Sequence, residues 1–346
     1  MHAEVLTAYL EQQLPSLELL GPPESLSGGL LNYVWRVPAK PQSFIAKYTP
    51  PYIAAAPQIA MDASRSRFEA DALRWWSEQK RIELADTIRP PRLLHAFAER
   101  SLILMEDLGD APNLAAILPQ IDHQAALKIG QQLGSFLAQL HATSFQDADL
   151  GQRFQNQGVQ SVRLAVQYNQ LAALQKAKIP QAQELAERIA QVGRWITKPG
   201  ICLIMGDLWP PSILHTQAGL RIIDWEFTHF GWPVQDVAHL AAHLWMQAHM
   251  AKTHEHIVAA NNCLFSFLET YFTAFGERSA TLEDRKLYFV HVGAEILART
   301  IGTFQAGYLY EGLPQQDIRL RSAVEFATQC ILSPKADGVF GPFFVI

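Results

Sequence analysis

The sequence predicts an α+β protein with two lobes, one built on short strands and the other mostly helical. Strand-like segments separated by glycine and proline turns dominate the first part of the chain, whereas beyond Asp110 apolar residues recur mainly at helical spacing. A chain of 346 residues also exceeds the length of about 250–300 residues at which a single core usually divides. We therefore expect a strand-rich lobe over residues 1–105, a linker over 106–110 and a helical lobe over 111–346.

Composition and charge argue against several classes of protein. Charged residues make up 18% of the chain and apolar residues 49%, as in ordinary globular proteins. The net charge of −5 argues against a nucleic-acid partner. Cys202, Cys263 and Cys330 are too few and too scattered for a disulfide framework or a zinc cluster, and the first residues carry no secretion pattern. We expect a cytoplasmic protein with no membrane partner, because no apolar stretch approaches the roughly 20 residues that span a bilayer.

Periodicity and turn residues locate the elements of both lobes. Alternating apolar residues indicate strands, and apolar residues three and four positions apart indicate helices. In the first lobe we expect, in order, a helix over 2–13, two strands about a Gly28-Gly29 turn, a strand over 43–48, a helix over 62–79 and two strands between 90 and 105. In the second lobe we expect helices over 127–144, 158–177, 180–197, 234–250, 254–275, 282–306 and 315–331.

The stretch ICLIMGDLWPPSILHTQAGLRIIDWE, residues 201–226, organises the rest of the chain. Asp207 follows a short apolar strand, and Asp224 follows a second one, so a hairpin-like excursion can bring the two carboxylates together. Carboxylates beside apolar strands cost free energy unless they are paired, hydrogen-bonded or bound to a cation. The pair therefore suggests a base and a metal ligand. The alternative is that each is an ordinary loop or helix-capping aspartate.

The segments GDLWPPSIL and IIDWE resemble the catalytic and metal-binding segments of the aminoglycoside phosphotransferase and choline kinase superfamily. This is the small-molecule branch of the protein-kinase-like fold. The resemblance implies a small N-lobe with an antiparallel sheet, a large helical C-lobe, and a kinase that uses ATP and Mg²⁺. It places Asp207 on the catalytic aspartate, which orients the substrate hydroxyl and accepts its proton. Asp224 falls on the aspartate that holds magnesium against the phosphates.

Two positions depart from the family pattern. Met205 replaces a histidine, which is expected to change packing only. Ser212 replaces an asparagine that ligates magnesium, and a hydroxyl is a poorer ligand than a carbonyl oxygen. Glu226 would compensate if residues 224–226 are extended, because its side chain would then point to the same side as that of Asp224. The alternative for Glu226 is a solvated loop carboxylate. Ser212, together with the Asp-x-Glu string of residues 224–226, also resembles the methylthioribose kinase branch.

Lys47 and Glu69 match the lysine and glutamate pair of the kinase architecture in order and in element type. In that architecture a strand lysine contacts the α- and β-phosphates and a helix glutamate holds it. Lys47 is the only charged residue in its predicted strand, and Glu69 lies beside the apolar stripe of the helix over 62–79. A solvent-facing lysine is the alternative, and Arg65 and Arg67 are rival partners for Glu69.

The resemblance assigns the remaining nucleotide contacts to main-chain groups. Gly28 and Gly29 fall on the hairpin that covers the phosphates, although a Gly-Gly turn in any small sheet looks the same. Glu106 and Leu108 match the linker positions whose backbone carbonyl and amide pair with adenine.

Three residues are candidates for the substrate side. Trp209 and Trp225 stand beside the two carboxylates and suit a platform for a sugar ring or a cation, or they pack the loop. Arg299 falls on one of two arginines that methylthioribose kinases carry near the substrate, and Ala298 replaces the other. Glu295 and Arg299 otherwise read as a helix-surface ion pair.

Three further features need a structural answer. His239 and His243 have the i, i+4 spacing of a zinc site, but Leu240 stands where the metalloprotease pattern has a glutamate. Asp236, near the first turn of its helix, can cap the helix or meet its dipole, and the resemblance implies that it braces the catalytic loop. The apolar tail GVFGPFFVI needs a surface to dock on, either its own lobe or a second subunit in a homodimer.

These observations lead to an ATP- and Mg²⁺-dependent kinase that phosphorylates a hydroxyl of a small molecule such as a sugar, an amino alcohol or an aminoglycoside. One alternative is a nucleotide-binding pseudokinase with a regulatory or scaffolding role, which Met205 and Ser212 favour. A second is an antibiotic-modifying kinase, which shares the chemistry and would need several carboxylates for a cationic sugar.

Overall fold

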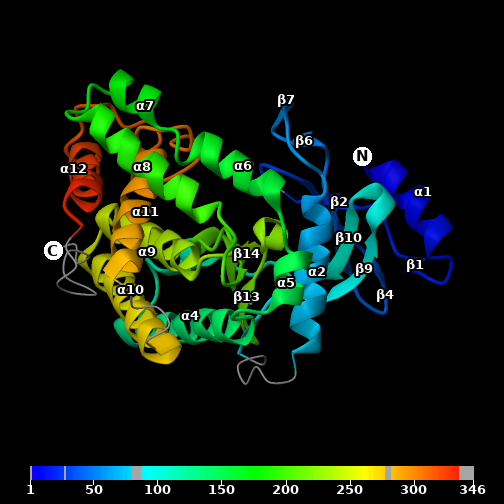
Figure 1. The fold of residues 1–346 in the computed structure, drawn as a ribbon. Coiled ribbons are helices and arrows are strands. Elements are labelled where there is room, and N and C mark those ends of the chain that lie inside the picture. The colour runs from blue at the N-terminus through cyan, green and yellow to red at the C-terminus, as the bar shows by residue number, and fades with distance from the viewer. Residues whose placement is uncertain (1, 27–28, 80–86, 277–281, 335–346) are drawn as a thin grey trace.

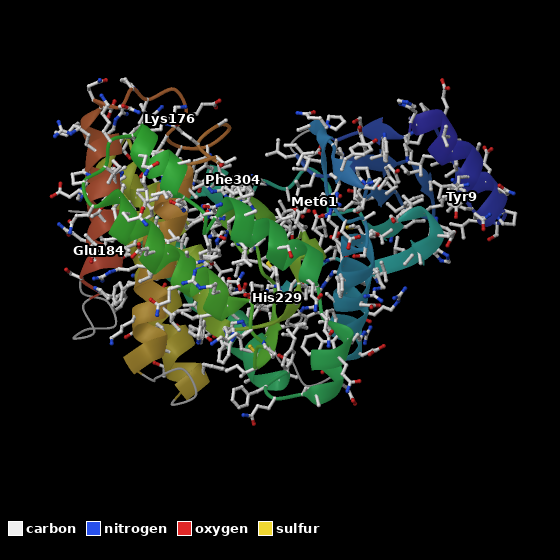
Figure 2. All side chains as sticks on the ribbon, turned by 45° about the horizontal axis from the view of Figure 1, so that its top comes forward. Tyr9, Met61, Lys176, Glu184, His229 and Phe304 are labelled. Carbon is white, nitrogen blue, oxygen red and sulfur yellow. The ribbon has the colours of Figure 1, made fainter. Side chains whose placement is uncertain are left out.

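A strand-rich lobe and a helical lobe make up the structure, a computed structural model that describes residues 2–26, 29–79, 87–276 and 282–334. Figure 1 shows the sheet with α1 and α2 on one side of the molecule and the long helices on the other. The predicted α+β, two-lobed fold class is confirmed. Figure 2 shows Tyr9 of the first lobe and Glu184 of the second at opposite ends of the molecule.

One five-stranded antiparallel sheet forms the centre of the first lobe. Its strand order is β2-β3-β5-β10-β9, and every neighbouring pair is antiparallel. The alternating side chains of these strands supply two apolar faces, as the period of two requires. The strands are β2 (Glu24–Ser25), β3 (Tyr33–Val37), β5 (Phe44–Tyr48), β9 (Leu93–Phe97) and β10 (Leu102–Glu106).

A helix covers each face of this sheet. On one face, α1 (Ala3–Gln13) buries Leu6 and Leu10 against strand residues that include Leu104. On the other face, α2 (Arg65–Glu78) packs Ala70 against Ile103 and its neighbours. Lys47 of β5 pairs in register with Ile103, so its side chain points to the face that α2 covers.

Several short elements of the first lobe were not predicted from sequence. The hairpin of β6 (Tyr52–Ile53) and β7 (Ala56–Ala60) leads into α2, and β1 (Glu18–Leu19) pairs with β4 (Ala39–Lys40). A single turn of 3₁₀ helix, η1 (Ala98–Arg100), joins β9 to β10.

Two long helices packed back to back support the second lobe. These are α4 (His123–Thr143) and α10 (His254–Phe275), whose backbones approach closely at Gly130 and Gly134. Around them lie α8 (Ala182–Ile196), α9 (Pro233–His249), α11 (Leu282–Thr300) and α12 (Ile318–Leu332). The short helices of this lobe are α3 (Leu114–Ile117), α5 (Ala148–Arg153), α6 (Gln157–Val166) and α7 (Leu171–Lys176).

The helix expected over 158–177 is two helices in the structure. The chain leaves the helical path between α6 and α7, where Gln167 and Gln170 are buried. The Gln170 amide donates to the carbonyls of Gln167 (2.6 Å) and Ala294 (2.7 Å). Both hydrogen bonds stabilise the break, and the one to Ala294 is a tertiary contact that no helical periodicity reveals.

The segment that follows carries two small sheets. In the first, β11 (Cys202–Ile204) pairs with β14 (His229–Gly231). In the second, β12 (Ile213–Thr216) and β13 (Gly219–Ile222) form a hairpin, and β8 (Ile88–Arg89) adds to β13 in parallel. Two 3₁₀ turns, η2 (Pro210–Ser212) and η3 (Trp225–Phe227), connect these strands.

Within the described ranges no helix is both long enough and apolar enough to cross a membrane. The three cysteines are buried and carry free thiols. The apolar tail, residues 338–346, lies outside the described residues, as does Gly28.

Candidate active site

The loop after β11 holds Asp207 in a fixed backbone conformation. Gly206 has φ +84°, and a Cβ there would lie 2.3 Å from the carbonyl oxygen of Phe227, so the turn requires glycine. Asp236, in the first turn of α9, accepts hydrogen bonds from the amides of Met205 (2.7 Å) and Gly206 (2.8 Å). Asp236 therefore braces the loop as expected. Met205 is fully buried in the core of the helical lobe, in keeping with a packing role.

The carboxylate of Asp207 meets two partners that the sequence did not suggest. The Arg163 guanidinium of α6 donates to Oδ1 at 2.7 Å, and Nε2 of His239 lies 3.4 Å from the same oxygen. Burial raises the pKa of Asp207, but the neighbouring imidazole of His239 and the charges of Arg163 and Arg299 outweigh it and hold this pKa well below its usual value. Asp207 is thus ionised, and it lies on a loop whose backbone is held by the hydrogen bonds to Asp236.

Lys47 lies at the centre of a buried ion cluster. Its Nζ is 2.9 Å from Oε2 of Glu69, 2.9 Å from Oδ1 of Asp224 and 3.5 Å from Oε1 of Glu226. The two rival arginines are placed elsewhere: Arg65 binds Glu226, and the Arg67 guanidinium lies over the ring of Phe68. The structure therefore brings together the predicted pair of Lys47 and Glu69.

This cluster carries more negative charge than one lysine can balance. Burial lowers the pKa of Lys47, but the carboxylates of Asp224, Glu69 and Glu226 raise it more, so the pKa lies well above the usual value and the ammonium stays charged. Burial, together with the other carboxylates and against the effect of Lys47, raises the pKa of Glu69 to about 7. The Asp224 side chain is 48% exposed, whereas those of Glu69 and Glu226 are nearly inaccessible. Asp224 is therefore the carboxylate that could face a divalent cation.

Glu226 does not lie beside Asp224 as an extended segment would place it. Asp224 has φ +67° in the left-handed region, and the chain turns at once into η3. The side chain of Glu226 consequently points into the interior, where its Oε1 accepts from Asn32 (2.5 Å) and its Oε2 from Nε of Arg65 (2.7 Å). The prediction of an extended segment was wrong, and the occupied oxygens argue against a metal-binding role for Glu226.

The hydroxyl of Ser212 is also engaged. It donates to the carbonyl of Trp209 at 2.8 Å and accepts from the Trp209 amide at 3.3 Å, which closes the single turn of η2. The Ser212 carbonyl accepts from the Ile223 amide at 2.9 Å and so links the two halves of the loop. These contacts assign Ser212 to the loop structure rather than to a metal ion.

Trp225 is a core residue and not a substrate platform. It is completely buried, and its ring packs edge-on against those of Trp76 (5.7 Å) and Phe136 (6.2 Å). Its indole N–H donates to the carbonyl of Ile222 at 2.8 Å. The turn at the preceding residue sends this side chain inward, which two-residue alternation did not anticipate.

Trp209 belongs to an aromatic group that surrounds Arg299. The Arg299 guanidinium lies 4.9 Å from the ring centre of Trp209, 5.1 Å from that of Phe304 and 5.2 Å from that of Tyr308. Trp209 is half-buried, two residues from Asp207, and Phe304 is 38% exposed. Figure 2 shows Phe304 on the same side of the helical lobe as Lys176, with Met61 of the first lobe beyond it. We call Arg299, Trp209, Phe304 and Tyr308 the arginine–aromatic cluster.

A buried polar network lies behind this cluster. Glu295 of α11 is 1% exposed and accepts from Arg299 Nε (2.7 Å), Gln167 (2.6 Å) and His243 Nε2 (3.0 Å). The alternative of a helix-surface pair is wrong in its location: Glu295 and Arg299 do pair, but α11 packs against α9 and the pair is buried. Glu295 brings a carboxylate to the two histidines, since ligand atoms of His239, His243 and Glu295 lie within 4.8 Å of one another. The donors already on Glu295, one of them a guanidinium, favour a hydrogen-bond network over a zinc site.

The linker residues lie where β10 ends. The Glu106 amide donates to the carbonyl of Arg92 at 2.9 Å, and its carboxylate binds both terminal nitrogens of Arg89 (2.7 and 2.9 Å). Leu108 follows the strand and is half-buried. A Cβ at Gly29 would make only an ordinary contact, with its nearest neighbour at 3.6 Å, so the structure shows no close backbone approach there.

Comparisons with known proteins identify a family and two kinase relatives. Residues 24–271 match the model of the phosphotransferase enzyme family. A 4-hydroxytryptamine kinase of Psilocybe cyanescens is 26% identical over 262 residues, which cover 68% of this chain and 71% of that protein. A methylthioribose kinase of Exiguobacterium sibiricum is 25% identical over 325 residues, 81% of this chain and 79% of that protein.

Solved structures share the fold. The choline kinase of Cryptosporidium parvum superposes with a TM-score of 0.55 at 15% identity and covers 98% of this chain and all of its own. From the family match and the kinase relatives together, the chain belongs to the phosphotransferase enzyme family and is a small-molecule kinase.

Proposed function

We propose that this protein transfers the γ-phosphoryl group of ATP, with Mg²⁺, to a hydroxyl of a small molecule. The observation that carries the proposal is the buried Lys47, held between Glu69 and Asp224 at 2.9 Å from each. A lysine charged and fixed in this way suits the α- and β-phosphates of a nucleotide. Asp207, on a braced loop, supplies the second carboxylate that phosphoryl transfer to a hydroxyl requires.

In the proposed reaction the acceptor oxygen forms a bond to the γ-phosphorus as the bond to the β,γ-bridging oxygen breaks. The products are the phosphorylated acceptor, ADP and a proton. Oδ1 of Asp207 is held by Arg163, and among the described residues none hydrogen-bonds to Oδ2, which is therefore left to accept from the acceptor hydroxyl. Because the pKa of Asp207 is so low, we assign it mainly to orienting the hydroxyl, with the proton passing onward to solvent.

In this proposal each residue of the ion cluster has a distinct role toward the nucleotide. Lys47 would brace the phosphates, with Glu69 fixing its position. The exposed carboxylate of Asp224 would hold Mg²⁺, whose charge neutralises the phosphates and the leaving group. Gly29 would line the nucleotide-covering hairpin, while main-chain groups of Glu106 and Leu108 would meet the adenine.

The arginine–aromatic cluster suits an acceptor that brings no positive charge. The faces of Trp209, Phe304 and Tyr308 are already directed to the cationic Arg299. The nearest carboxylate, Glu295, is buried and fully engaged, so it has little capacity for a second cation. We therefore favour a neutral, sugar-like acceptor such as methylthioribose over amines such as choline, 4-hydroxytryptamine or aminoglycosides.

Release of ADP from ATP and Mg²⁺ against a panel of these acceptors tests the proposal. Turnover should depend on a sugar-like acceptor and should fall below detection in Asp207→Asn, which keeps the side-chain shape. Asp149→Asn, an exposed carboxamide substitution on α5, should leave turnover unchanged. Lys47→Met should weaken ATP binding as well as catalysis.

Two results would change the assignment. Nucleotide binding without turnover on any acceptor would favour the pseudokinase alternative. Failure to bind nucleotide at all would rule out both functions.

A further inference from the structure

Arg163 makes contacts that are unusual for an arginine in the middle of a helical lobe. It projects from α6, is 7% exposed, and its terminal nitrogen NH2 donates both to Oδ1 of Asp207, at 2.7 Å, and to the carbonyl oxygen of Gly206. Its other terminal nitrogen donates to Gln167 at 2.9 Å, and the guanidinium lies 5.2 Å from the ring centre of Phe227. One side chain thus contacts both the side chain and the backbone of the catalytic loop.

His239 approaches the same carboxylate from α9. Its Nε2 lies 3.4 Å from Oδ1 of Asp207, and its Nδ1 lies 3.7 Å from Oε2 of Glu295. The ring is 2% exposed, and neither nitrogen has a hydrogen-bond partner among the described residues. An imidazole buried without partners costs free energy, so its position between two carboxylates calls for a role.

We propose that Arg163 and His239 are positioning residues that clamp Oδ1 of Asp207 and so leave Oδ2 directed at the acceptor hydroxyl. The effect of the clamp on catalysis rests on the proposed kinase function. The clamp itself concerns only the orientation and the charge of the Asp207 carboxylate. Neither residue contacts the transferring group in this assignment. They act through the orientation and the charge of the carboxylate.

The physical advantage of the clamp is restricted rotation. The backbone before Asp207 is fixed by Asp236, which accepts the amides of Met205 and Gly206. That contact leaves the side-chain torsions of Asp207 undetermined, and the bond from Arg163 removes this freedom. A misplacement of about 1 Å at a reacting group can lower a rate about 10²-fold, so the clamp can account for an effect of that size.

The clamp also keeps Asp207 ionised. Three groups on three helices face its carboxylate: Arg163 on α6, His239 on α9 and Arg299 on α11. Burial by itself would raise the pKa of this carboxyl above that of a solvated aspartate. When Arg163 is removed, one of the effects that oppose burial is lost, so the pKa of Asp207 should rise.

Steady-state kinetics of Arg163→Met and Arg163→Lys test the positioning role. Arg163→Met should lower kcat about 10²-fold with the KM for ATP within twofold, and its acid limb in the pH profile of kcat should move to higher pH. Arg163→Lys should recover part of kcat, because a cation is restored. Arg319→Met, which removes an exposed arginine on α12, should match the unmodified protein.

The titration of Asp207 separates this inference from the proposed function. In the carboxyl ¹³C spectrum, the signal lost in Asp207→Asn should titrate at a higher pH in Arg163→Met than in the unmodified protein. That readout needs no turnover. An unchanged Asp207 titration in Arg163→Met would overturn the clamp even if the kinase activity is found.

A second variant distinguishes a positioning role from a general loss of folding. His239→Asn should shift the pH profile in the same direction, because the imidazole of His239 also holds the pKa of Asp207 down. A fall in melting temperature with an unchanged pH profile in both variants would mean that the two residues only support the fold.

Discussion

The buried carboxylate of Glu226 connects the two lobes. It accepts from Asn32 and Arg65 and lies 3.5 Å from Lys47, all three in the strand-rich lobe, although it belongs to the helical lobe. Arg65 is itself fully buried and also donates to the carbonyls of Asp62 (2.8 Å) and Pro50 (3.0 Å). One side chain therefore joins the lobes at the base of the ion cluster.

Removal of this charge should be strongly destabilising. In Glu226→Gln the buried guanidinium of Arg65 would lose its counter-ion, which typically costs about 3–5 kcal/mol of unfolding free energy. Urea denaturation followed by circular dichroism measures this loss. Glu184→Gln breaks a half-exposed pair with Arg188 at 2.7 Å and should cost at most about 1 kcal/mol. Equal losses in the two variants would contradict the structural role of Glu226.

The residue scale is also where sequence reasoning failed most often. The pairing of Lys47 with Glu69 could be predicted, because both lie on elements with clear periodicity. Trp225 and Glu226 could not, because the left-handed turn at Asp224 reverses the directions that an extended chain would give them. Arg163 was missed because a lone arginine in a helix carries no signal of what its guanidinium will meet.

At the scale of elements, the contact between α4 and α10 supports the loop that carries Asp207. A Cβ on Gly130 would lie 2.1 Å from Oγ of Ser266 and 2.3 Å from the carbonyl oxygen of Cys263. The far end of α4 reaches the loop, since Oγ of Ser144 accepts from the Leu203 amide at 2.9 Å and His141 lies 3.4 Å from Asp236. Close packing of the two helices thus sets the position of β11.

A methyl group at this contact should therefore destabilise the lobe. Gly130→Ala should lower the unfolding free energy by about 1–3 kcal/mol through overpacking, because the obstructing carbonyl oxygen belongs to the backbone. Thermal and urea denaturation measure the change.

Gly151 on α5 provides the matched substitution. A Cβ there would meet the ring of Phe230 at 3.5 Å, an ordinary contact, so Gly151→Ala should be neutral or stabilising by about 0.5–1 kcal/mol. A loss in Gly151→Ala as large as that in Gly130→Ala would show that helix contact is not the cause.

Long periodic elements were predicted well, and short ones were not. The helices α4, α8, α10 and α12 lie close to their expected ranges because their apolar stripes are continuous. The β6–β7 hairpin was missed, since Ala56–Ala60 is largely exposed and has no buried face to impose alternation. The parallel pairing of β8 with β13 could not be predicted from a local pattern either, because it depends on contacts between distant parts of the chain.

At the scale of the whole molecule, buried neutral histidines set a pH limit on stability. Burial lowers the pKa of His229 to about 4, with its hydrogen bond to the Phe227 carbonyl acting in the opposite sense. Burial likewise lowers the pKa of His243 to about 3, against the effect of Glu295. Figure 2 places His229 within the helical lobe, away from the molecular ends.

Stability should consequently fall as the pH falls from about 6.5 toward 4. In that window the unfolded chain binds protons at these histidines, with an ordinary pKa near 6.5, while the folded protein does not. Each such proton contributes a slope of about 1.4 kcal/mol per pH unit. Urea denaturation at half-unit pH intervals measures the slope.

His229→Phe should flatten this slope by about one proton, whatever its effect on stability at neutral pH. His254→Gln, at an exposed position in α10, should leave the slope unchanged. An unaltered slope in His229→Phe would mean that the ring is already protonated in the folded state.

The burial of all three thiols gives the protein internal reporters of its own opening. Burial raises the pKa of Cys263 and Cys330 to about 12 and that of Cys202 well above its usual value, so none is reactive while its surroundings stay closed. They lie on β11, α10 and α12, three separate parts of the helical lobe. The rate at which an alkylating reagent modifies each one therefore measures how often that part opens, and the order of modification would map local unfolding without any introduced label.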